Sequence, residues 1–351
     1  MTKICIITDQ HFGIRSDNVA FLDFYEKFYK NVFFPKIDKE NITTILILGD
    51  TFDRRKYINY NSLSRAKAMF FDEIEARNIQ VHMLVGNHDI SFKNTNEINS
   101  PDLLLKEYSN FNIIENPITI NIDETKICMV PWICPDMLDN TLEVMKNTQA
   151  EICMGHFEIS GFAMYKGMEC KDGLKTSIFD KFDMTFSGHY HHKSNKKHIY
   201  YLGNPYELTW QDYGDERGFH LFDLKTRKLE FIKNPYSIFV RIEYDDSKEI
   251  VDLNSLELKD CFVKLVIVNK IDYYQFDIFL QKLYGKGCID IKIIEDLSEF
   301  SDGEIGEEIN LEDTASILSH YIDSVATDLD KDEVKHFMQK LYIEAVNIEM
   351  V

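Results

Sequence analysis

Short strings that end in metal-binding side chains are scattered over the first 204 residues of this chain, and they constrain its fold more than any other feature. Most follow directly on a run of β-branched or other apolar residues, a pattern that predicts a buried strand ending in a tight turn. The apolar runs are Ile4–Thr8, Ile45–Leu48, Val81–Val85, Ile152–Met154 and Met184–Phe186. The side chains that end the strings are Asp9, His11, Asp50, Asn87, His88, Asp89, His156, His189 and His191, with weaker echoes at Asp53 and Asn204.

The expected strand ends predict where these side chains meet. In an α/β sheet, residues just beyond the carboxyl ends of the strands converge on one crevice. The strings would therefore bring carboxylates, several imidazoles and one amide to a single place. One metal ion does not need so many ligands, so the pattern predicts a centre for two. Taken singly, the acids and the amide would be turn formers and the histidines buried, hydrogen-bonded imidazoles.

Composition limits the other classes of function. The net charge of −20 argues against a free-standing nucleic-acid-binding protein, because phosphate contacts need Lys and Arg. Most of the excess of acid over base lies in residues 295–335, which hold 14 Asp and Glu but only two Lys, Lys331 and Lys335. The seven cysteines form no CxxC pair, which indicates reduced, buried thiols. The N-terminus is a strand rather than a signal peptide, and no apolar stretch reaches the ~18 residues that span a membrane, so we expect a cytoplasmic protein.

Hydrophobic periodicity predicts an α/β (α+β) fold with four layers. Strands alternate with helices at the start of the chain, where Phe21, Phe24, Tyr25 and Phe28 recur at helical spacing, as do residues from Leu63 through Ile74. This βαβαβ order indicates a largely parallel beginning. After Pro117 most apolar runs have the length of strands, and residues 218–224 and 229–232 predict a hairpin. We expect two mixed sheets packed face to face, with helices outside.

The chain is expected to have four parts. Residues 1–235 form the large domain, and residues 236–295 form a small α+β module. Residues 296–311 are an acidic linker, and residues 312–351 predict two amphipathic helices that form a hairpin. The hairpin has more apolar surface than it can bury alone, which favours docking to a partner. The alternative is that it packs back on its own domain.

The strings D-x-H, G-D-x-F-D, G-N-H-D, G-H-F and G-H-Y-H follow one another in this order. Together they resemble the calcineurin-like metallophosphoesterase superfamily. Within it the chain is similar to the SbcD-type recombination nucleases, and most of all to the nuclease subunits of T-even bacteriophages. The resemblance covers essentially the whole chain, with further likeness at residues 49–56, 130–132, 161–162, 165–168 and 217–219.

The resemblance implies a division of the ligands between two ions. Asp9, His11, Asp50 and His191 would hold the first ion, and Asp50, Asn87, His156 and His189 the second, so that Asp50 bridges them. The mixture of carboxylate, imidazole and amide suits two Mn²⁺ ions, with Fe or Zn as alternatives and Mg²⁺ less favoured. Two ions supply a water nucleophile at neutral pH and a clamp for the phosphoryl oxygens.

Three residues beside the expected ligands are assigned other tasks. His88 directly follows Asn87 and is expected to act in catalysis, by stabilising the transition state or protonating the leaving oxygen. Asp89, which we also place among the catalytic residues, would orient His88. Some relatives have His in place of Asp53, and Asp53 is expected to orient either His88 or a ligand.

The resemblance also implies partners. The C-terminal hairpin would bind an SbcC-type SMC-like ATPase at the base of its coiled coil, and two nuclease subunits would form a homodimer within a heterotetramer. We place the dimer contact at Leu63–Phe71. The substrate would be DNA, cut by an exonuclease activity at double-stranded ends and an endonuclease activity on single strands, in recombination, repair and replication. If the source is a virus, the location would be the cytoplasm of its bacterial host.

Two other functions remain open at the level of sequence. The same ligands would serve a stand-alone metallophosphoesterase that acts on small phosphoesters or nucleotides, although such an enzyme needs no docking hairpin. A non-catalytic scaffold is the third, and it is disfavoured because every ligand position is filled. Deletion of residues 312–351 separates the first two, since it would abolish only the processive digestion of DNA.

Overall fold

The computed structural model describes residues 3–165, 168–295, 321–323 and 329–346. The chain divides into two compact units, residues 1–294 and residues 295–351. The acidic linker expected at residues 296–311 lies outside the described residues, as does most of the first helix expected in the C-terminal hairpin. Among the described residues, no helix combines the length and the apolar character needed to cross a bilayer.

The first large sheet carries the N-terminal ligand strings. Its strand order is β16-β15-β1-β2-β3-β6, and the pairs β1–β2, β2–β3 and β3–β6 are parallel, as the βαβαβ pattern predicted. β15 and β16 form the predicted antiparallel hairpin. The bounds are β1 (Lys3–Ile7), β2 (Thr44–Ile47), β3 (Gln80–Leu84), β6 (Phe111–Ile114), β15 (Gly218–Asp223) and β16 (Leu229–Lys233).

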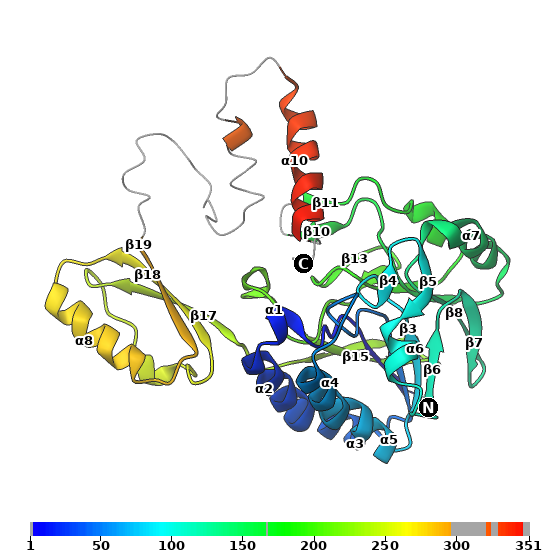
Figure 1. The fold of residues 1–351 in the computed structure, drawn as a ribbon, viewed down its shortest axis with the longest axis horizontal. Helices are drawn as coiled ribbons and strands as arrows, with labels where there is room; N and C mark the ends of the chain where they lie inside the picture. Colours follow the sequence, from blue (N-terminus) through cyan, green and yellow to red (C-terminus); the bar gives the residue numbers. More distant parts are fainter. Residues whose placement is uncertain (1–2, 166–167, 296–320, 324–328, 347–351) are drawn as a thin grey trace. The chain divides into compact units, whose positions relative to one another are not determined.

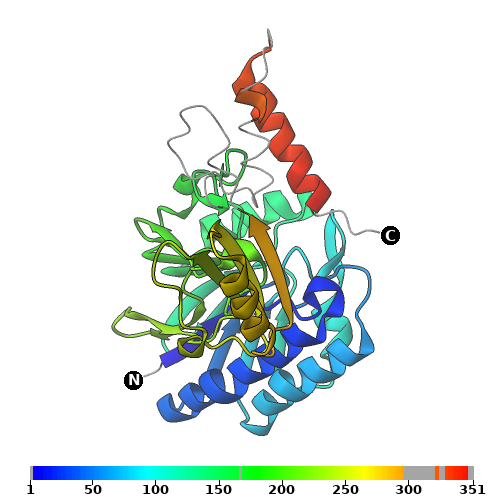
Figure 2. The ribbon, with the colours of Figure 1, turned by 90° about the vertical axis from the view of Figure 1, so that its left-hand side faces the viewer.

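Helices rich in aromatic residues cover one face of this sheet. Figure 1 shows α2, α3, α4 and α5 along that face, and Figure 2 shows the same layer after a quarter turn. α2 begins where the side chain of Asn18 accepts a hydrogen bond from the amide of Ala20. The segments are α1 (Ile14–Asp17), α2 (Val19–Phe28), the π-helical turn η1 (Tyr29–Phe33), α3 (Phe34–Glu40), α4 (Tyr60–Ala66), the π-helical turn η2 (Lys67–Phe71) and α5 (Asp72–Ala76).

The second large sheet carries the later ligand strings. Its strand order is β13-β14-β12-β9-β8-β7, with α7 (Leu138–Asn147) between β8 and β9 in the chain. Met145 of α7 belongs to a buried cluster with Cys128 and Cys153 of this sheet. The bounds are β7 (Ile118–Ile122), β8 (Thr125–Val130), β9 (Ile152–His156), β12 (Met184–Gly188), β13 (Ser194–Lys196) and β14 (Ile199–Tyr201).

Alternation along the buried strands builds the four expected layers. In β1, Ile4 and Ile6 belong to a cluster that also contains Met154 and Phe186 of the second sheet. Cys5 and Ile7 belong instead to the cluster formed with the helices. Because successive side chains of a strand point to opposite faces, each sheet is apolar on both sides. The expected arrangement of two mixed sheets face to face, with helices outside, is confirmed.

The core between the sheets should be sensitive to loss of volume. Phe186 is fully buried there, with its ring centroid 5.1 Å from that of Phe222. We expect Phe186→Ala to lower the free energy of unfolding by about 3–5 kcal/mol, because it removes buried contacts and leaves a cavity. Urea unfolding would measure this loss. Phe92→Ala, at a side chain that is 54% exposed, is the control, and an equal effect of both substitutions would contradict the packing described.

A three-stranded sheet and one helix form the small module. The strand order is β17-β18-β19, with β17 (Phe239–Asp245), β18 (Phe262–Asn269), β19 (Asp290–Glu295) and α8 (Tyr273–Tyr284). Phe276, Phe279 and Leu283 of α8 pack on one face of this sheet. Aromatic contacts join the module to the large domain, since the ring centroid of Phe21 lies 5.7 Å from that of Phe262.

Several short elements were not predicted from the sequence. They include the strand β6 and a two-stranded hairpin that directly follows Asp89. The hairpin strands are too short to show a clear alternation of apolar and polar residues. The remaining short segments are β4 (Ile90–Phe92), β5 (Thr95–Asn99), α6 (Ser100–Leu104), η3 (Pro135–Met137), β10 (Ala163–Tyr165), β11 (Met168–Glu169), η4 (Thr176–Phe179), η5 (Trp210–Asp212) and η6 (Leu253–Ser255). The longer helix α10 (Lys331–Val346) lies where the second helix of the C-terminal hairpin was expected.

Candidate metal centre

The turns at the strand ends hold several of the proposed ligands in an unusual backbone conformation. Asp9, His11, Asp50 and His189 have positive φ angles of 53°, 47°, 50° and 85°. Residues other than glycine rarely adopt this region, and such conformations cost roughly 1–3 kcal/mol each. Strain of this kind collects at functional sites, where the surrounding structure imposes it. The backbone therefore marks these strand ends independently of their side chains.

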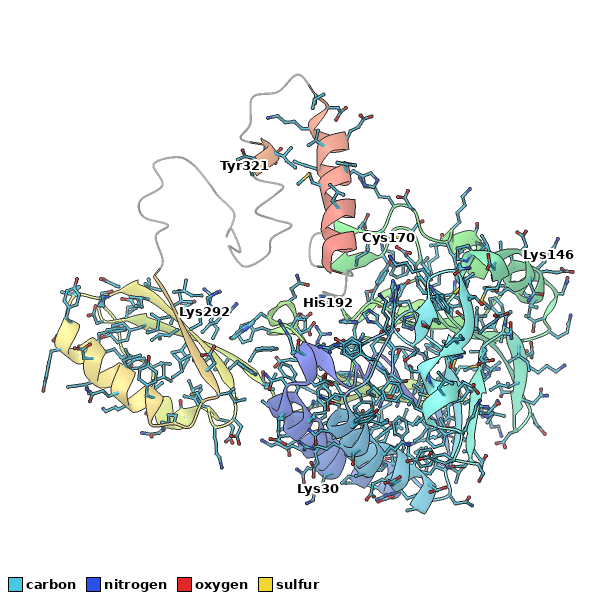
Figure 3. The ribbon with its side chains drawn as sticks, viewed as in Figure 1. Lys30, Lys146, Cys170, His192, Lys292 and Tyr321 are labelled. Atoms are coloured by element: carbon cyan, nitrogen blue, oxygen red, sulfur yellow. The ribbon has the colours of Figure 1, made fainter. Side chains whose placement is uncertain are left out.

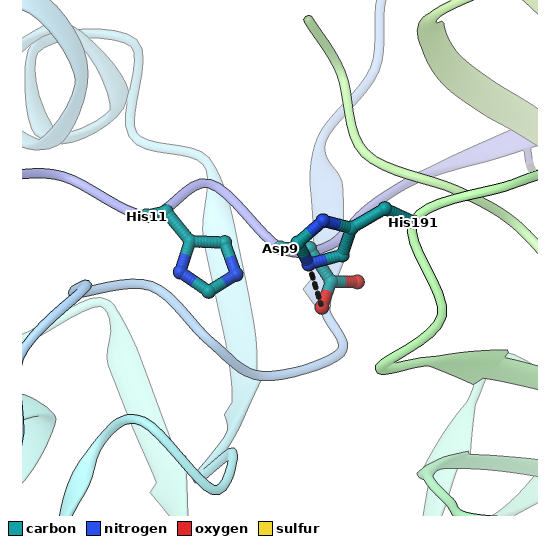
Figure 4. A group of neighbouring side chains, drawn as sticks. All are labelled: Asp9, His11 and His191. Atoms are coloured by element: carbon teal, nitrogen blue, oxygen red, sulfur yellow. Dashed lines mark ion pairs between the residues drawn. The ribbon is translucent and has the colours of Figure 1, made fainter. Parts of the chain in front are cut away.

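One group of side chains consists of Asp9, His11 and His191, whose ligand atoms lie within 4.8 Å of one another (Figure 4). The His191 Nε2 atom is 4.0 Å from Asp9 Oδ1, and His11 Nε2 is 3.8 Å from Asp50 Oδ2. His11 Nε2 is buried and has no hydrogen-bond partner. A buried nitrogen without a partner is costly, and a cation bound among these atoms would satisfy it. We call this group, together with Asp50, site 1.

A second group lies beside the first and shares Asp50 with it. The ligand atoms of Asp50, His156 and His189 also lie within 4.8 Å of one another. Asn87 Oδ1 is 2.9 Å from His156 Nε2 and 2.9 Å from His189 Nδ1, and His156 Nε2 is 3.2 Å from Asp50 Oδ2. We call this group, with Asn87, site 2. The seven residues expected as ligands thus come together as two groups that meet at one carboxylate.

Further hydrogen bonds orient the rings in both groups. His156 donates from Nδ1 to the Leu48 carbonyl at 2.7 Å, which leaves Nε2 toward Asp50 and Asn87. The Nδ1 atom of His11 is 3.2 Å from Asp53 Oδ1. Metal-binding histidines commonly use their second nitrogen in this way, and such a contact fixes the ring and its tautomer. Of the two tasks expected for Asp53, this contact favours the orientation of a proposed ligand, His11.

His88 lies beside both groups. Its backbone amide donates to Asp50 Oδ1 at 2.8 Å, and its ring Nδ1 lies 2.6 Å from the Asp53 carbonyl oxygen. The centroid of the ring is 4.8 Å from that of His11. With Nδ1 engaged by the backbone, Nε2 is the ring atom available to a substrate. This arrangement suits a proton donor next to the ions.

The structure gives Asp89 different contacts from those expected. Its carboxylate accepts hydrogen bonds from the amides of Thr51, Phe52 and Gly86, at 2.9–3.3 Å. In the described part of the chain, Asp89 and His88 share no hydrogen bond. The expected orientation of His88 by Asp89 is therefore replaced by the contact with the Asp53 carbonyl. Asp89 instead joins the turn after β2 to the turn after β3.

The centre attracts positive charge. Burial lowers the pKa of His11, but the contacts with Asp53 and Asp50 raise it to about 9. Burial likewise lowers the pKa of His156, and Asp50 raises it to about 9. Burial beside His156 lowers the pKa of His189 to about 3, so its imidazole is neutral. Divalent cations bound here would replace the protons that the carboxylates otherwise hold on His11 and His156.

Comparison with known proteins identifies the family. A model of the calcineurin-like phosphoesterases matches residues 2–193, which contain every residue of sites 1 and 2. The chain belongs to the calcineurin-like phosphoesterase family. It is therefore a metal-dependent phosphoesterase, a hydrolase.

Individual relatives extend the match beyond this domain. The phosphoesterase is 29% identical over 349 residues to "Exonuclease subunit 1" of Enterobacteria phage T4, covering 98% of this chain and 99% of the relative. It is 26% identical over 215 residues to "Putative phosphoesterase 244L" of Invertebrate iridescent virus 6, covering 58% of this chain and 69% of the relative. The solved structure of an archaeal phosphodiesterase is similar at a TM-score of 0.35 and 13% identity, covering 66% of this chain and all of that one.

The donor set of the phosphoesterase fits divalent metal ions. Carboxylate, amide and imidazole groups converge from the ends of both large sheets. Asp50 Oδ2 lies near a histidine of each group, while Asp50 Oδ1 accepts a hydrogen bond from the His88 amide. Such a mixed oxygen and nitrogen set suits first-row divalent ions. The family therefore implies divalent metals here, and the residues of sites 1 and 2 are able to hold them.

Glycines permit the close approach of the ligand turns. A Cβ atom at Gly86 would lie 2.2 Å from both the amide nitrogen and Oδ1 of Asp50. A Cβ atom at Gly188 would lie 2.1 Å from Thr8 Oγ1 and 2.9 Å from Asp9 Oδ2. Neither distance is tolerated between heavy atoms that are not bonded. Gly86 and Gly188, which precede Asn87 and His189, therefore allow their backbone to lie against Asp50 and Asp9. Any side chain at either position would occupy the space that these acids fill.

Substitution of one such glycine should damage the centre. We expect Gly86→Ala to displace Asp50 and weaken the binding of both cations at least ~10-fold, as changes to the supports of metal ligands commonly do. Titration with Mn²⁺ of the metal-depleted protein measures this loss. Gly285→Ala is the control, because its nearest neighbour would be the Lys282 carbonyl at 3.4 Å. Unchanged Mn²⁺ affinity in Gly86→Ala would refute the argument from close approach.

Sequence reasoning missed some residues that support the centre. Trp132 packs against His189, with ring centroids 5.0 Å apart. Arg217 donates to the backbone carbonyl of His191. Both lie in strings that contributed to the family resemblance, but neither has a spacing that connects it with the ligands. Only the family resemblance could have indicated that Trp132 and Arg217 lie near the centre.

Proposed function

We propose that this phosphoesterase is the nuclease subunit of a DNA-processing complex, cutting double-stranded ends as an exonuclease and single strands as an endonuclease. The observation that carries the proposal is the similarity over nearly the whole chain to a protein named exonuclease subunit 1. The family match ends at residue 193, whereas this similarity continues through the small module and the C-terminal segment. Recombination, repair and replication of DNA are the processes that such an activity serves.

Sites 1 and 2 would each hold one divalent ion. When bound, the ions activate a water molecule and stabilise negative charge on the phosphoryl oxygens. Asp50 holds the two sites together, and Asp53 keeps the ring of His11 in place. His88 directs its free ring nitrogen to the substrate, where it protonates the leaving oxygen. We propose Mn²⁺ as the ion, with Fe or Zn as alternatives, because imidazole nitrogens disfavour Mg²⁺.

Positive charge near the centre supports a polyanionic substrate. Arg54, Arg55 and Lys56 directly follow the turn that carries Asp50 and Asp53. Tyr57 and Tyr60 in the same segment are exposed, Tyr60 by 87%. Basic side chains next to exposed aromatic rings are typical of surfaces that bind single strands, because bases stack on the rings.

The small module carries a second group of basic side chains. Arg241 and Lys264 are register partners on β17 and β18, and Lys292 lies on the face of this sheet turned away from α8 (Figure 3). Burial, together with the nearby charges of Lys292 and Arg241, lowers the pKa of Lys264 to about 8. Like charges placed side by side destabilise a sheet unless an anion neutralises them. This supports our assignment of residues 236–295 as a module that contacts DNA beside the nuclease domain of residues 1–235.

The C-terminal segment is our proposed site for the partner, an SbcC-type SMC-like ATPase. Residues 312–351 would dock to its coiled coil, beyond the linker of residues 296–311. In α10, Phe337 is 61% exposed and Leu341 is 43% exposed, which leaves apolar surface available. The net charge of −20 also favours a partner that supplies basic surface for a long duplex.

We retain Leu63–Phe71 as the proposed contact of a homodimer within the heterotetramer. Phe70 and Phe71 are fully buried in the domain, so this contact would use the outward residues Ser64 and Ala68 together with Tyr60. Exposed aromatic residues on a helix are common at interfaces between subunits.

Cleavage assays test the proposed function. The purified chain is titrated with Mn²⁺ against linear duplex DNA, single-stranded DNA, and the diester and monoester of p-nitrophenyl phosphate, with and without the ATPase. We expect cleavage of DNA that requires Mn²⁺ and increases with the ATPase and ATP. Turnover of the monoester without cleavage of DNA would refute the proposal and favour a phosphatase of small substrates. Deletion of residues 312–351 should abolish only the effect of the ATPase.

A further inference from the structure

We infer that Arg217 is a positioning residue for His191, and that it sets the affinity of site 1 for its cation. The inference rests on the proposed function, because it takes His191 as a metal ligand. Arg217 is only 4% exposed. Among the described residues, its hydrogen bonds reach no side chain of the proposed ligands. Its Nη1 atom donates to the backbone carbonyl of His191 and to the side-chain oxygen of Asn204.

The turn that carries His191 depends on these contacts. β12 ends at Gly188, and residues 189–193 lie in no helix or strand. The His191 carbonyl also accepts a hydrogen bond from the Asn204 amide at 3.3 Å. A Cβ atom at Gly203 would lie 2.8 Å from the same carbonyl oxygen. Arg217 and residues 203–204 therefore fix the backbone of a ligand that regular structure does not hold.

The other end of the guanidinium is anchored by two acids. Arg217 Nη2 lies 2.9 Å from Asp212 Oδ1 and 3.2 Å from Asp215 Oδ2. Asp212 itself is buried, and its second oxygen accepts from the amides of Leu208 and Thr209 at 2.7 and 2.9 Å. The anchor is therefore a fixed turn rather than a flexible surface acid.

The placement of a charged group here has a cost that packing alone does not explain. A guanidinium removed from water is expensive even when it is paired, and apolar residues of similar size often stabilise such a position better. The planar guanidinium bonds two turns at once, the turn of His191 and the turn of Asp212. The single ammonium group of lysine does not reproduce this geometry.

The inference predicts a selective defect. Arg217→Met and Arg217→Lys should each weaken one of the two Mn²⁺ binding steps about 10–100-fold, the range usual for residues that support metal ligands. The second step should keep its affinity, because His156 and His189 have separate supports in Leu48 and Trp132. A general loss of structure would weaken both steps together.

Calorimetric titration of the metal-depleted full chain with Mn²⁺ is the test, with His191→Ala as the reference. We expect the Arg217 variants to lose the same step as His191→Ala, and the double variant to lose no more than His191→Ala alone. Arg77→Met is the matched control, since Arg77 bonds Asp38 and Glu73 on the helical surface. Urea unfolding of the metal-free proteins shows whether each variant folds, and Arg217→Lys keeps a positive charge for Asp212 if the Met variant does not.

The outcomes distinguish this inference from the proposed function. If both Mn²⁺ steps in a folded Arg217 variant match the original chain, or if both weaken equally, the inference is overturned. If His191→Ala itself retains both steps, the proposed ligand set is wrong and the inference falls with it. Titration requires no DNA, so failure of the chain to cleave DNA would refute the nuclease proposal without affecting this result.

Discussion

Asp50→Ala is expected to abolish binding of both cations, and with it all measurable hydrolysis. Asp50 is the one carboxylate common to sites 1 and 2, with Oδ2 lying 3.2 Å from His156 Nε2 and 3.8 Å from His11 Nε2. Burial opposes its ionisation, but His156 and His88 hold its pKa well below the usual range, so it is a carboxylate at neutral pH. Its removal leaves site 2 without a carboxylate and site 1 with Asp9 alone.

Metal content measured after Mn²⁺ loading and desalting checks this expectation, together with turnover of a diester. Asp50→Asn preserves the shape of the side chain and should fail in the same way, because an amide does not replace a bridging charge. Asp223→Ala is the matched control. Asp223 is also a buried acid that accepts backbone amides, at 3.0 and 2.7 Å, but it lies at the turn between β15 and β16. One ion retained in Asp50→Ala would show that Asp50 does not bridge.

His88→Ala is expected to keep both cations and still lose most turnover. Removal of a general acid commonly reduces the rate by about 10²–10⁴-fold. The bond from the residue 88 amide to Asp50 survives the substitution, because it is made by the backbone. The defect should therefore lie in kcat, while KM for the diester changes little.

Paired measurements of Mn²⁺ stoichiometry and of kcat decide the role of His88. His82→Ala serves as the control, since His82 lies on β3 and contacts Asn112 away from the centre. A substrate whose leaving group needs no proton, such as a p-nitrophenyl diester, should lose less turnover than DNA. Equal loss with both substrates, or loss of a cation, would contradict the assignment of His88 as the acid.

The large sheets were predictable because their strands are buried on both faces. Continuous apolar runs such as Ile45–Leu48 end abruptly in a glycine and an acid, and a strand followed by a turn is the simplest structure for that order. The ligands could be expected to meet for the same reason. The positive φ of Asp9 and Asp50 could not be predicted, since any short turn would satisfy the pattern.

Hydrogen bonds between a side chain and a backbone group could not be predicted from the sequence. Asp89 was expected to orient its neighbour His88, but its oxygens accept hydrogen bonds from two amides of the turn after β2 and from the Gly86 amide of its own turn. The partner of His88 is the carbonyl of Asp53, and the partner of Arg217 is the carbonyl of His191. Every residue has a backbone carbonyl, so neither residue type nor spacing in the sequence predicts such a contact. The small hairpin β4–β5 was missed for a related reason, since its two ends are joined by a backbone hydrogen bond from the Ser100 amide to the Asp89 carbonyl, at 2.8 Å.

The sequence separations within the centre bear on when activity can begin in a newly made chain. The His189 amide bonds Asp9 across 180 positions, and His156 bonds Leu48 across 108. β1, which leads to Asp9, is paired on one side by β15, whose residues are synthesised after every proposed ligand. Domains generally fold as units during synthesis. A chain that has not yet been translated through β15 therefore lacks a strand that supports the centre, and we expect the hydrolase to stay inactive until its large domain has folded.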